Sequence, residues 1–150
     1  ITYDTDENLY SILYFENNQI ESLRLDFIAH LNLDTRHHAP DNVEMEHKLC
    51  EIAPNVWGNL FHDVPKSVKV KFYKEGRVWE KVRRDLECRT NGKLYEKNGF
   101  LYYEDIVYGF SKFSNWIYGY GSSAIVIEPK WLRQRIIQSL QARKNAWEND

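Results

Sequence analysis

The chain has 150 residues, of which 43% are hydrophobic, and a formal net charge of −2, so it can bury a core in one domain or two small ones. Its apolar runs are all shorter than the roughly 18 residues of a membrane-spanning helix, and its polar, acidic beginning does not have the pattern of a signal peptide. Cys50 and Cys88 lie far apart without a metal-binding pattern, which favours reduced thiols. These properties predict a soluble, cytoplasmic protein without membrane association.

The first predicted elements form a small β module. Residues 9–15 are an aromatic and β-branched run typical of a strand, and after a polar turn residues 20–33 return with apolar side chains at several positions. Two such segments predict a β-hairpin. Beyond a loop at 34–41, residues 42–53 have the apolar spacing of a helix of about three turns that ends near Pro54.

A second series of elements starts at residue 68. Residues 68–72 alternate apolar side chains with lysines, as a half-buried strand does, and residues 76–84 place apolar side chains on one helical face and bases on the other. Residues 86–89 read as a short strand. Residues 94–97 and 100–107 read as two more strands, joined by an Asn-Gly turn.

The end of the chain has the most specific pattern. An aromatic helix at 110–118 meets Gly119 and Gly121, residues suited to a left-handed helix cap. A β-branched strand follows at 124–127, and Pro129 suits the first turn of a final amphipathic helix. The apolar residues expected to give this helix one buried face are Leu132, Ile136, Leu140 and Trp147.

This order of elements predicts an α+β fold. Strand, helix, two or three strands, helix and strand is the order of a ferredoxin-like split βαβ domain, here with an extra C-terminal helix. The domain would follow the partial β module of the first half.

The segment 115–140 closely resembles the WCX extension, which follows the WYL domain in bacterial transcription regulators. The family has a helix that ends in Trp-Ile/Leu-x-x-x-Gly, as residues 116–121 do here. It then has a strand that ends in a Val-Leu-Glu-Pro-like string, which corresponds to residues 126–129.

The first half is similar to the second half of a WYL domain. Residues 9–14 match its Trp-Tyr-Leu-Val-x-Tyr-like strand, although only Tyr10 of the naming triplet is present. Residues 21–28 match its next, arginine-containing strand, in which Arg24 is the matching base, and residues 56–58 match its Phe/Trp-Gly connector.

Together the two resemblances cover nearly the whole chain. They imply that residues 1–64 are a partial, SH3/Sm-like WYL barrel with a connector helix, and that residues 65–150 are the WCX extension. The chain then corresponds to the C-terminal fragment of a longer regulator, whose DNA-reading winged helix-turn-helix lies upstream of it.

The resemblance implies sensing rather than catalysis, with a nucleotide-like or nucleic-acid ligand held by Tyr10 and Arg24 and no cofactor. An arginine fork suits phosphate, and a tyrosine ring can stack on a base. Phe27 stands where the family has a second base. The alternative is that Arg24 pairs with Asp26 or Glu21 and that Tyr10 only packs across the hairpin.

The charge is distributed unevenly. Residues 1–60 hold eleven acidic and three basic side chains, whereas residues 61–150 hold eleven acidic and seventeen basic ones. The densest segment, 66–84, has eight bases and two acids. It predicts a phosphate or nucleic-acid site, or a solvated basic face without a ligand, and the sequence leaves both open.

Within this segment Arg77, Lys81 and Arg84 have helical spacing, so one face can carry all three as further ligand-binding residues. In related regulators the extension crosses a dimer, which implies a homodimer in which this face meets the partner's acidic module or its ligand. Two alternatives stay open. The segment 66–84 binds single-stranded nucleic acid directly, or the chain is a purely structural dimerisation domain.

Two other arrangements are weaker. Five potential metal ligands lie close in sequence, but without paired zinc spacings they read as surface residues: His37, His38, Asp41, His47 and Cys50. The aromatic residues 100–103 could stack nucleobases, although strand alternation favours packing. The chain has no Gly-x-Ser-x-Gly, phosphate-loop or His-Glu-x-x-His motif, and the sequence predicts no enzyme.

Overall fold

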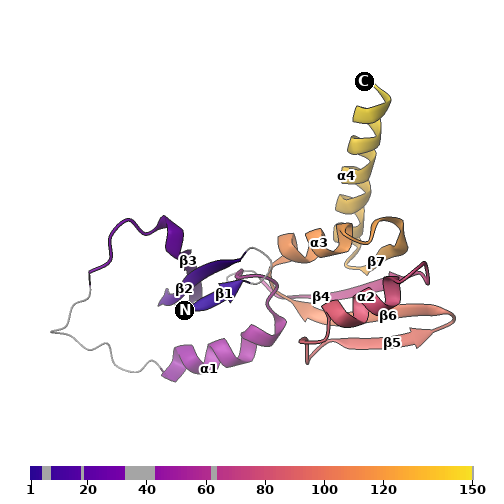
Figure 1. Ribbon diagram of the computed structural model, residues 1–150. Helices are drawn as coiled ribbons and strands as arrows, with labels where there is room; N and C mark the ends of the chain where they lie inside the picture. The colour runs from indigo at the N-terminus through magenta and orange to yellow at the C-terminus, as the bar shows by residue number, and fades with distance from the viewer. Residues whose placement is uncertain (5–7, 18, 33–42, 62–63, 150) are drawn as a thin grey trace.

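The computed structural model describes residues 1–4, 8–17, 19–32, 43–61 and 64–149 (Figure 1). The described elements form two separate antiparallel sheets and four α-helices. This mixture of helices and antiparallel sheets confirms the predicted α+β class. The finer SH3-like and ferredoxin-like descriptions stay predictions, and so does the domain boundary after residue 64.

The N-terminal sheet has the order β1-β2-β3, with β1 (Thr2–Asp4), β2 (Leu9–Glu16) and β3 (Gln19–Arg24). The predicted hairpin is therefore present, but its second strand is much shorter than the expected 20–33. The strand ends because Leu25–Phe27 form a 3-10 turn, in which the Ile28 N–H donates to the Leu25 carbonyl.

A small core joins this sheet to α1 (Val43–Ile52), which a 3-10 turn at Ala53–Asn55 continues. The helix matches the predicted one, apart from residue 42, which lies outside the described residues. The core is centred on Ile20, Ile52 and Phe61, each at most 8% exposed. Among the described residues it is much smaller than the core of the second half, because only these three side chains form its buried centre.

The C-terminal sheet is four-stranded and antiparallel throughout, in the order β5-β6-β4-β7. Asn98 and Gly99 connect β5 to β6 with φ of +52° and +76°, the left-handed pair that a two-residue hairpin turn requires. The strands that were expected at these places are all present. They are β4 (Lys66–Phe72), β5 (Lys93–Lys97), β6 (Phe100–Val107) and β7 (Ala124–Glu128).

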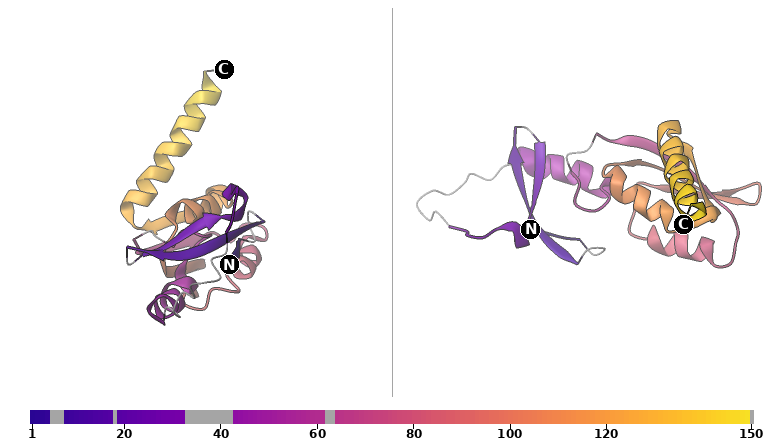
Figure 2. Two further views of the ribbon diagram at one scale, coloured as in Figure 1. Left: turned by 90° about the vertical axis from the view of Figure 1, so that its left-hand side faces the viewer. Right: turned by 90° about the horizontal axis from the view of Figure 1, so that it is seen from above.

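Two helices, α2 (Val78–Asp85) and α3 (Phe110–Tyr118), cover one face of this sheet (Figure 2). Strand alternation sends every second side chain to that face, and these side chains are almost completely buried. The members of the buried cluster from strands and helices include Val68, Val70, Phe72, Val82, Leu101, Tyr103, Phe113 and Ile117. The side chains between them on the strands face the opposite side of the sheet.

Two local predictions in this half were wrong. Residues 86–89 are turns and not a strand, because the N–H groups of Leu86, Glu87 and Arg89 donate to carbonyls of α2 and of Leu86 and are not available to a ladder. Gly119 has a right-handed φ of −64°, and only Gly121, at +55°, uses the left-handed region.

The last helix, α4 (Lys130–Glu148), is buried only at its beginning. Leu132 is fully buried and Ile136 packs on the core, but Leu140 is 50% and Trp147 86% exposed. The expected buried face is therefore wrong for the later turns. A helix of 19 residues is about 28 Å long, and α4 extends away from the sheet (Figure 1). Among the described residues, no helix has the length and apolar character needed to cross a membrane.

The connector binds to the C-terminal half at residues 55–57. The Trp57 N–H donates to the Tyr108 carbonyl at 3.0 Å, and the Tyr108 N–H donates to the Asn55 carbonyl at 3.0 Å. The Trp57 ring lies 5.3 Å from Phe113 and 4.8 Å from Trp116, centre to centre. The segment that follows α1 thus packs into the core of the second half.

Candidate anion-binding site

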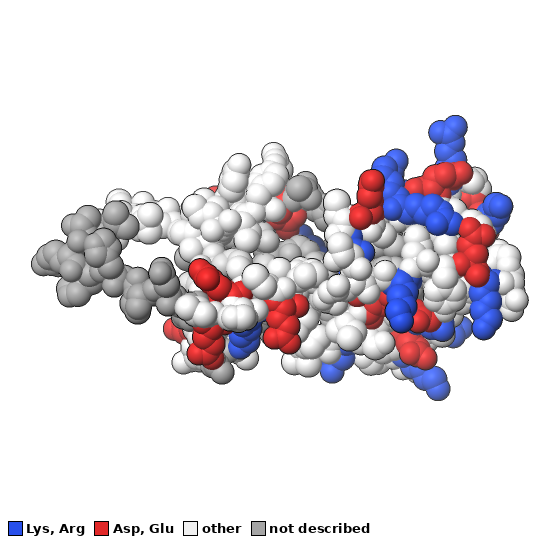
Figure 3. All heavy atoms as spheres, turned by 90° about the horizontal axis from the view of Figure 1, so that it is seen from below, with Lys and Arg blue, Asp and Glu red and all other residues white. Residues whose placement is uncertain are grey.

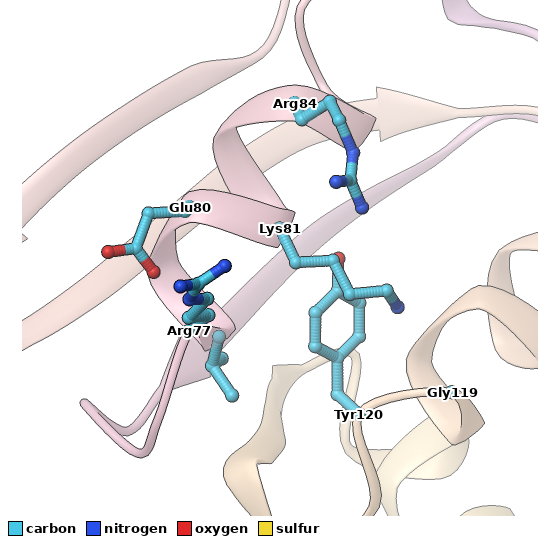
Figure 4. Close-up of a pocket in the computed structure, with 7 residues that line it drawn as sticks. Arg77, Glu80, Lys81, Arg84, Gly119 and Tyr120 are labelled. Atoms are coloured by element: carbon cyan, nitrogen blue, oxygen red, sulfur yellow. The ribbon is translucent and has the colours of Figure 1, made fainter.

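Three of the predicted site residues lie together on α2 and at its start. Arg77, Lys81 and Arg84 line a depression of about 700 Å³ whose other side is formed by Gly119 and Tyr120 (Figure 4). The i,i+4 and i,i+3 spacings bring them to one helix face, while Val82 points into the core. We name these three cations and Tyr120 the α2 site.

Tyr120 forms the floor of the α2 site. It is 6% exposed, and its hydroxyl donates to Oδ2 of Asp85 at 2.7 Å. The Trp116 indole N–H donates to the same oxygen at 3.2 Å. Burial, together with the Asp85 hydrogen bond, raises the pKa of Tyr120 above its usual range, so its hydroxyl stays neutral. The ammonium of Lys81 lies 3.9 Å from the centre of this ring.

The α2 site carries an excess of positive charge. Asp85 is shared between Lys81 and Arg84, with N–O distances of 3.6 and 3.7 Å, which are longer than hydrogen bonds. Arg77 forms no ion pair with any residue that the structure describes, and Glu80 lines the same depression. Three cations thus face two carboxylates, and the guanidinium donors are available to an anionic ligand.

The structure does not bring Tyr10 and Arg24 together. Arg24 pairs with Ser11 in the hairpin, so strand alternation sends Arg24 and Tyr10 to opposite faces of the N-terminal sheet. Tyr10 is 55% exposed, and its ring lies 4.7 Å from that of Tyr3. A ligand that stacks on Tyr10 therefore does not reach the guanidinium of Arg24 across the sheet.

Arg24 already has a partner. Its guanidinium donates to Asp26 at 2.9 Å and 2.5 Å and lies 4.5 Å from the centre of the Phe27 ring. Asp26 raises the pKa of Arg24 and has its own pKa lowered by the same hydrogen bonds. The alternative in which Arg24 pairs with Asp26 therefore describes the structure, although Arg24 also lines a depression of about 280 Å³ beside Ser22 and Lys112.

The basic segment 66–84 does not form one surface. Lys69 and Lys71 alternate with the buried side chains of β4, so they lie on the sheet face that the helices leave open. Arg77 and Lys81 belong to the α2 region, which covers the other face. Seen from below, basic and acidic side chains are interspersed in this half (Figure 3).

Sequence reasoning missed two residues that shape the α2 site. Tyr120 lies far along the chain, and only the packing of α3 on α2 places it under Lys81. Asp85 follows Lys81 at i,i+4, a spacing that could have indicated it. The described residues include no group of three His, Cys, Asp or Glu side chains that could hold a metal ion. Of the sequence cluster, His37, His38 and Asp41 lie outside the described residues.

Fold and site together define an α+β domain with a cationic depression on its helical side. A family model agrees with this class: the WCX domain matches residues 65–142. The match covers more than half of the chain, and the chain belongs to the WCX domain family. This membership supports a WYL-associated regulatory region, as the resemblance implied. No curated protein matches the chain.

Proposed function

We propose that the chain is the effector-sensing and dimerisation region of a bacterial WYL-family transcriptional regulator. The observation that carries this proposal is the α2 site in a WCX domain, where three cations converge over a buried tyrosine. In this proposal the chain acts in the cytoplasm without catalysis, and a winged helix-turn-helix upstream of it reads the DNA.

The chemistry of the α2 site favours a phosphate group. Arg77 and Arg84 each present a planar fork, which suits bidentate contact with phosphate oxygens, and Lys81 adds a compact charge. Tyr120 is too deeply buried to stack on a base. The site therefore recognises the phosphate part of a nucleotide-like ligand more strongly than its base.

Dimerisation is supported by the exposed side of α4. Ile137, Leu140 and Trp147 are 54%, 50% and 86% exposed, and Ile137 and Leu140 line a groove of about 240 Å³ beside β7. A second copy that covers this row of side chains would remove it from water. Ligand binding would then favour one dimer arrangement and change operator affinity by linkage.

The test is a thermal-shift screen of the whole chain against inorganic phosphate, mononucleotides, cyclic and oligomeric nucleotides and short single strands, at two salt concentrations. A ligand present at a hundred times its Kd stabilises the folded state by about 2.7 kcal/mol. We expect a nucleotide to raise the Tm of the chain at both salt concentrations. This rise in Tm should be lost in the double variant R77A/R84A. The matched control is Arg83→Ala, because Arg83 is on the same helix but pairs with Glu96 at 2.7 Å outside the site.

The dimer is tested by light scattering over a range of concentrations. Reversal of Arg77 and Arg84 to glutamate should weaken both ligand binding and dimerisation if the α2 site meets a partner's acidic module. Unchanged values for both would remove that arrangement. Dimerisation without any ligand response would favour a purely structural domain. If, in the thermal-shift screen, only oligonucleotides raised the Tm, and only at low salt, direct nucleic-acid binding would be favoured.

A further inference from the structure

The side of the C-terminal sheet opposite α2 and α3 is a continuous surface of aromatic and basic side chains, which we call the open face. Burial alternates along β4 and β6: Val68, Val70, Leu101 and Tyr103 are at most 1% exposed, whereas the residues between them are partly or fully exposed. No described element therefore buries this face. Its members by register and ring contact are Ser67, Lys69, Lys71, Tyr73, Lys93, Tyr95, Lys97, Phe100, Tyr102, Glu104, Ile106, Ile125 and Glu128.

Aromatic rings occupy the middle of the open face. Tyr102, on the inner strand β6, lies 5.4 Å from Tyr95 of the neighbouring strand, with the two rings nearly parallel at 11°. Tyr73 and Phe100 form a second pair at 5.2 Å, edge to face. Tyr95 and Tyr102 are directly opposite in the register, so these rings form a platform that the backbone holds in place.

Lysines surround this platform. Lys71 lies 4.6 Å from the centre of the Phe100 ring and 4.8 Å from that of Tyr73, and Lys69 lies 5.8 Å from that of Tyr102. Lys93 and Lys97 project from the same side of β5. These lysines are only partly buried, so their ammonium groups can leave the contact with a ring and contact a phosphate instead.

Two carboxylates lie on this face, both opposite Lys69 in the register: Glu128 on the edge strand β7 and Glu104 on β6. Glu104 accepts from Lys69 at 2.6 Å and from the Tyr95 hydroxyl at 2.5 Å, and the hydrogen bond from Lys69 is the main cause that lowers the pKa of Glu104. Glu104 is therefore ionised at neutral pH and holds Lys69 over the sheet. It also opposes an approaching phosphate, so its removal is a sensitive test of which ligand the face binds.

We propose that the open face binds single-stranded nucleic acid, with bases stacked on Tyr102 and its neighbouring rings and phosphates contacted by Lys69 and Lys71. Aromatic platforms with a basic surround suit single strands, because every base has a π-face and the strand's charge complements the lysines. Duplex DNA does not fit, because its bases are already stacked on each other. This surface is separate from the α2 site, and the proposal goes beyond effector binding there.

The experiment measures binding of the whole chain to fluorescein-labelled dT10 by anisotropy, with the corresponding duplex as competitor. Stacking on a ring contributes about 1–3 kcal/mol per base, so Tyr102→Ala should weaken dT10 binding by about 5- to 150-fold. Lys71→Ala should lower the slope of the salt dependence by about 0.7, because this variant can neutralise one phosphate of the single strand fewer. Glu104→Gln should strengthen binding, which a failure to fold cannot imitate.

The matched control is Arg83→Ala, which removes a base from α2 outside both the open face and the α2 site, and it should bind dT10 as the unchanged chain does. Circular dichroism checks that each variant folds, and Tyr102→Leu keeps an apolar side chain where the alanine variant does not fold. Three results would overturn the proposal: equal binding by Tyr102→Ala and the unchanged chain, loss of binding only in R77A/R84A, or equal affinity for duplex. Self-association that Tyr102→Ala abolishes while dT10 has no effect would also overturn it, and would assign the face to a second copy.

Discussion

The most buried charge pair in the described structure gives the sharpest prediction. Oδ2 of Asp105 accepts from Nε and Nη2 of Arg89 at 3.1 and 2.9 Å and from the Tyr103 hydroxyl at 2.5 Å. The Asp105 side chain is 1% exposed and that of Arg89 12%. Arg89 also donates to the Val56 carbonyl at 3.0 Å and lies 4.6 Å from the centre of the Trp57 ring. The pair thus fastens the connector to the sheet.

The perturbation is Asp105→Asn, which keeps the shape and removes the charge. The guanidinium of Arg89 then stays buried without a counter-charge. The side-chain amide of the new asparagine can also place its N–H₂ group, which only donates, against the donor groups of Arg89 and Tyr103. Removal of one partner of a buried pair destabilises a protein by about 3–5 kcal/mol. In a chain of this size that corresponds to a fall in Tm of about 6–20 °C.

The assay is urea unfolding at neutral pH, followed both by circular dichroism and by tryptophan fluorescence, to which Trp57 contributes beside the guanidinium. The control is Glu96→Gln, which breaks the Arg83–Glu96 pair whose side chains are 49% and 56% exposed. An exposed pair contributes at most about 1 kcal/mol. If Asp105→Asn lowered the free energy of unfolding by no more than Glu96→Gln does, the argument that the buried Arg89–Asp105 pair stabilises the contact between connector and sheet would be refuted.

Three further predictions concern the second half. Burial raises the pKa of Tyr103, so the folded state keeps its proton and stability should fall as pH rises above about 10; Tyr103→Phe should flatten that fall in thermal melts at several pH values. Gly109→Ala should lower the free energy of unfolding in urea by well over about 1 kcal/mol, because φ is +78° and the new Cβ would lie 2.3 Å from the Trp57 backbone oxygen. The control is Gly76→Ala, where φ is +51° and the space is open, so only the backbone strain should be seen and the loss should be smaller. Leu132→Ala should cost about 2–5 kcal/mol in the same measurement, whereas Leu140→Ala, at a half-exposed position, should cost much less; equal costs would mean that α4 is covered along its length.

Local periodicity predicted the elements whose partners are close in sequence. The alternation in residues 68–72 and 100–107 located β4 and β6 almost to the residue, because one face of each strand is buried by the helices. The same reasoning failed for α4, since an apolar row at helical spacing shows only which side could be buried. Whether Trp147 is buried depends on what packs beside the helix. The later turns of α4 extend beyond the sheet, so the sheet does not cover Trp147.

The candidate site divides in the same way. Helical spacing was sufficient to place Arg77, Lys81 and Arg84 on one face, because that placement needs no knowledge of tertiary structure. Whether Tyr10 and Arg24 lie on the same face of the N-terminal sheet depends on the register of the hairpin. A shift of one residue in the pairing would move the side chains of one strand to the other face. A polar turn indicates where a hairpin lies but does not fix its register.

The basic segment shows why charge density along a chain is a poor guide to a binding surface. Between Lys69 and Arg77 the chain leaves the sheet and enters a helix that crosses the opposite face, so neighbouring bases in sequence are separated by the thickness of the core. One small ligand cannot contact both groups within a single copy. The α2 site, with its deeply buried tyrosine, favours an isolated phosphate, whereas the open face, with its partly exposed rings, favours a chain of bases. Variants on α2 and on β6 should therefore affect different ligands, and that independence distinguishes two functional surfaces from one long basic stripe.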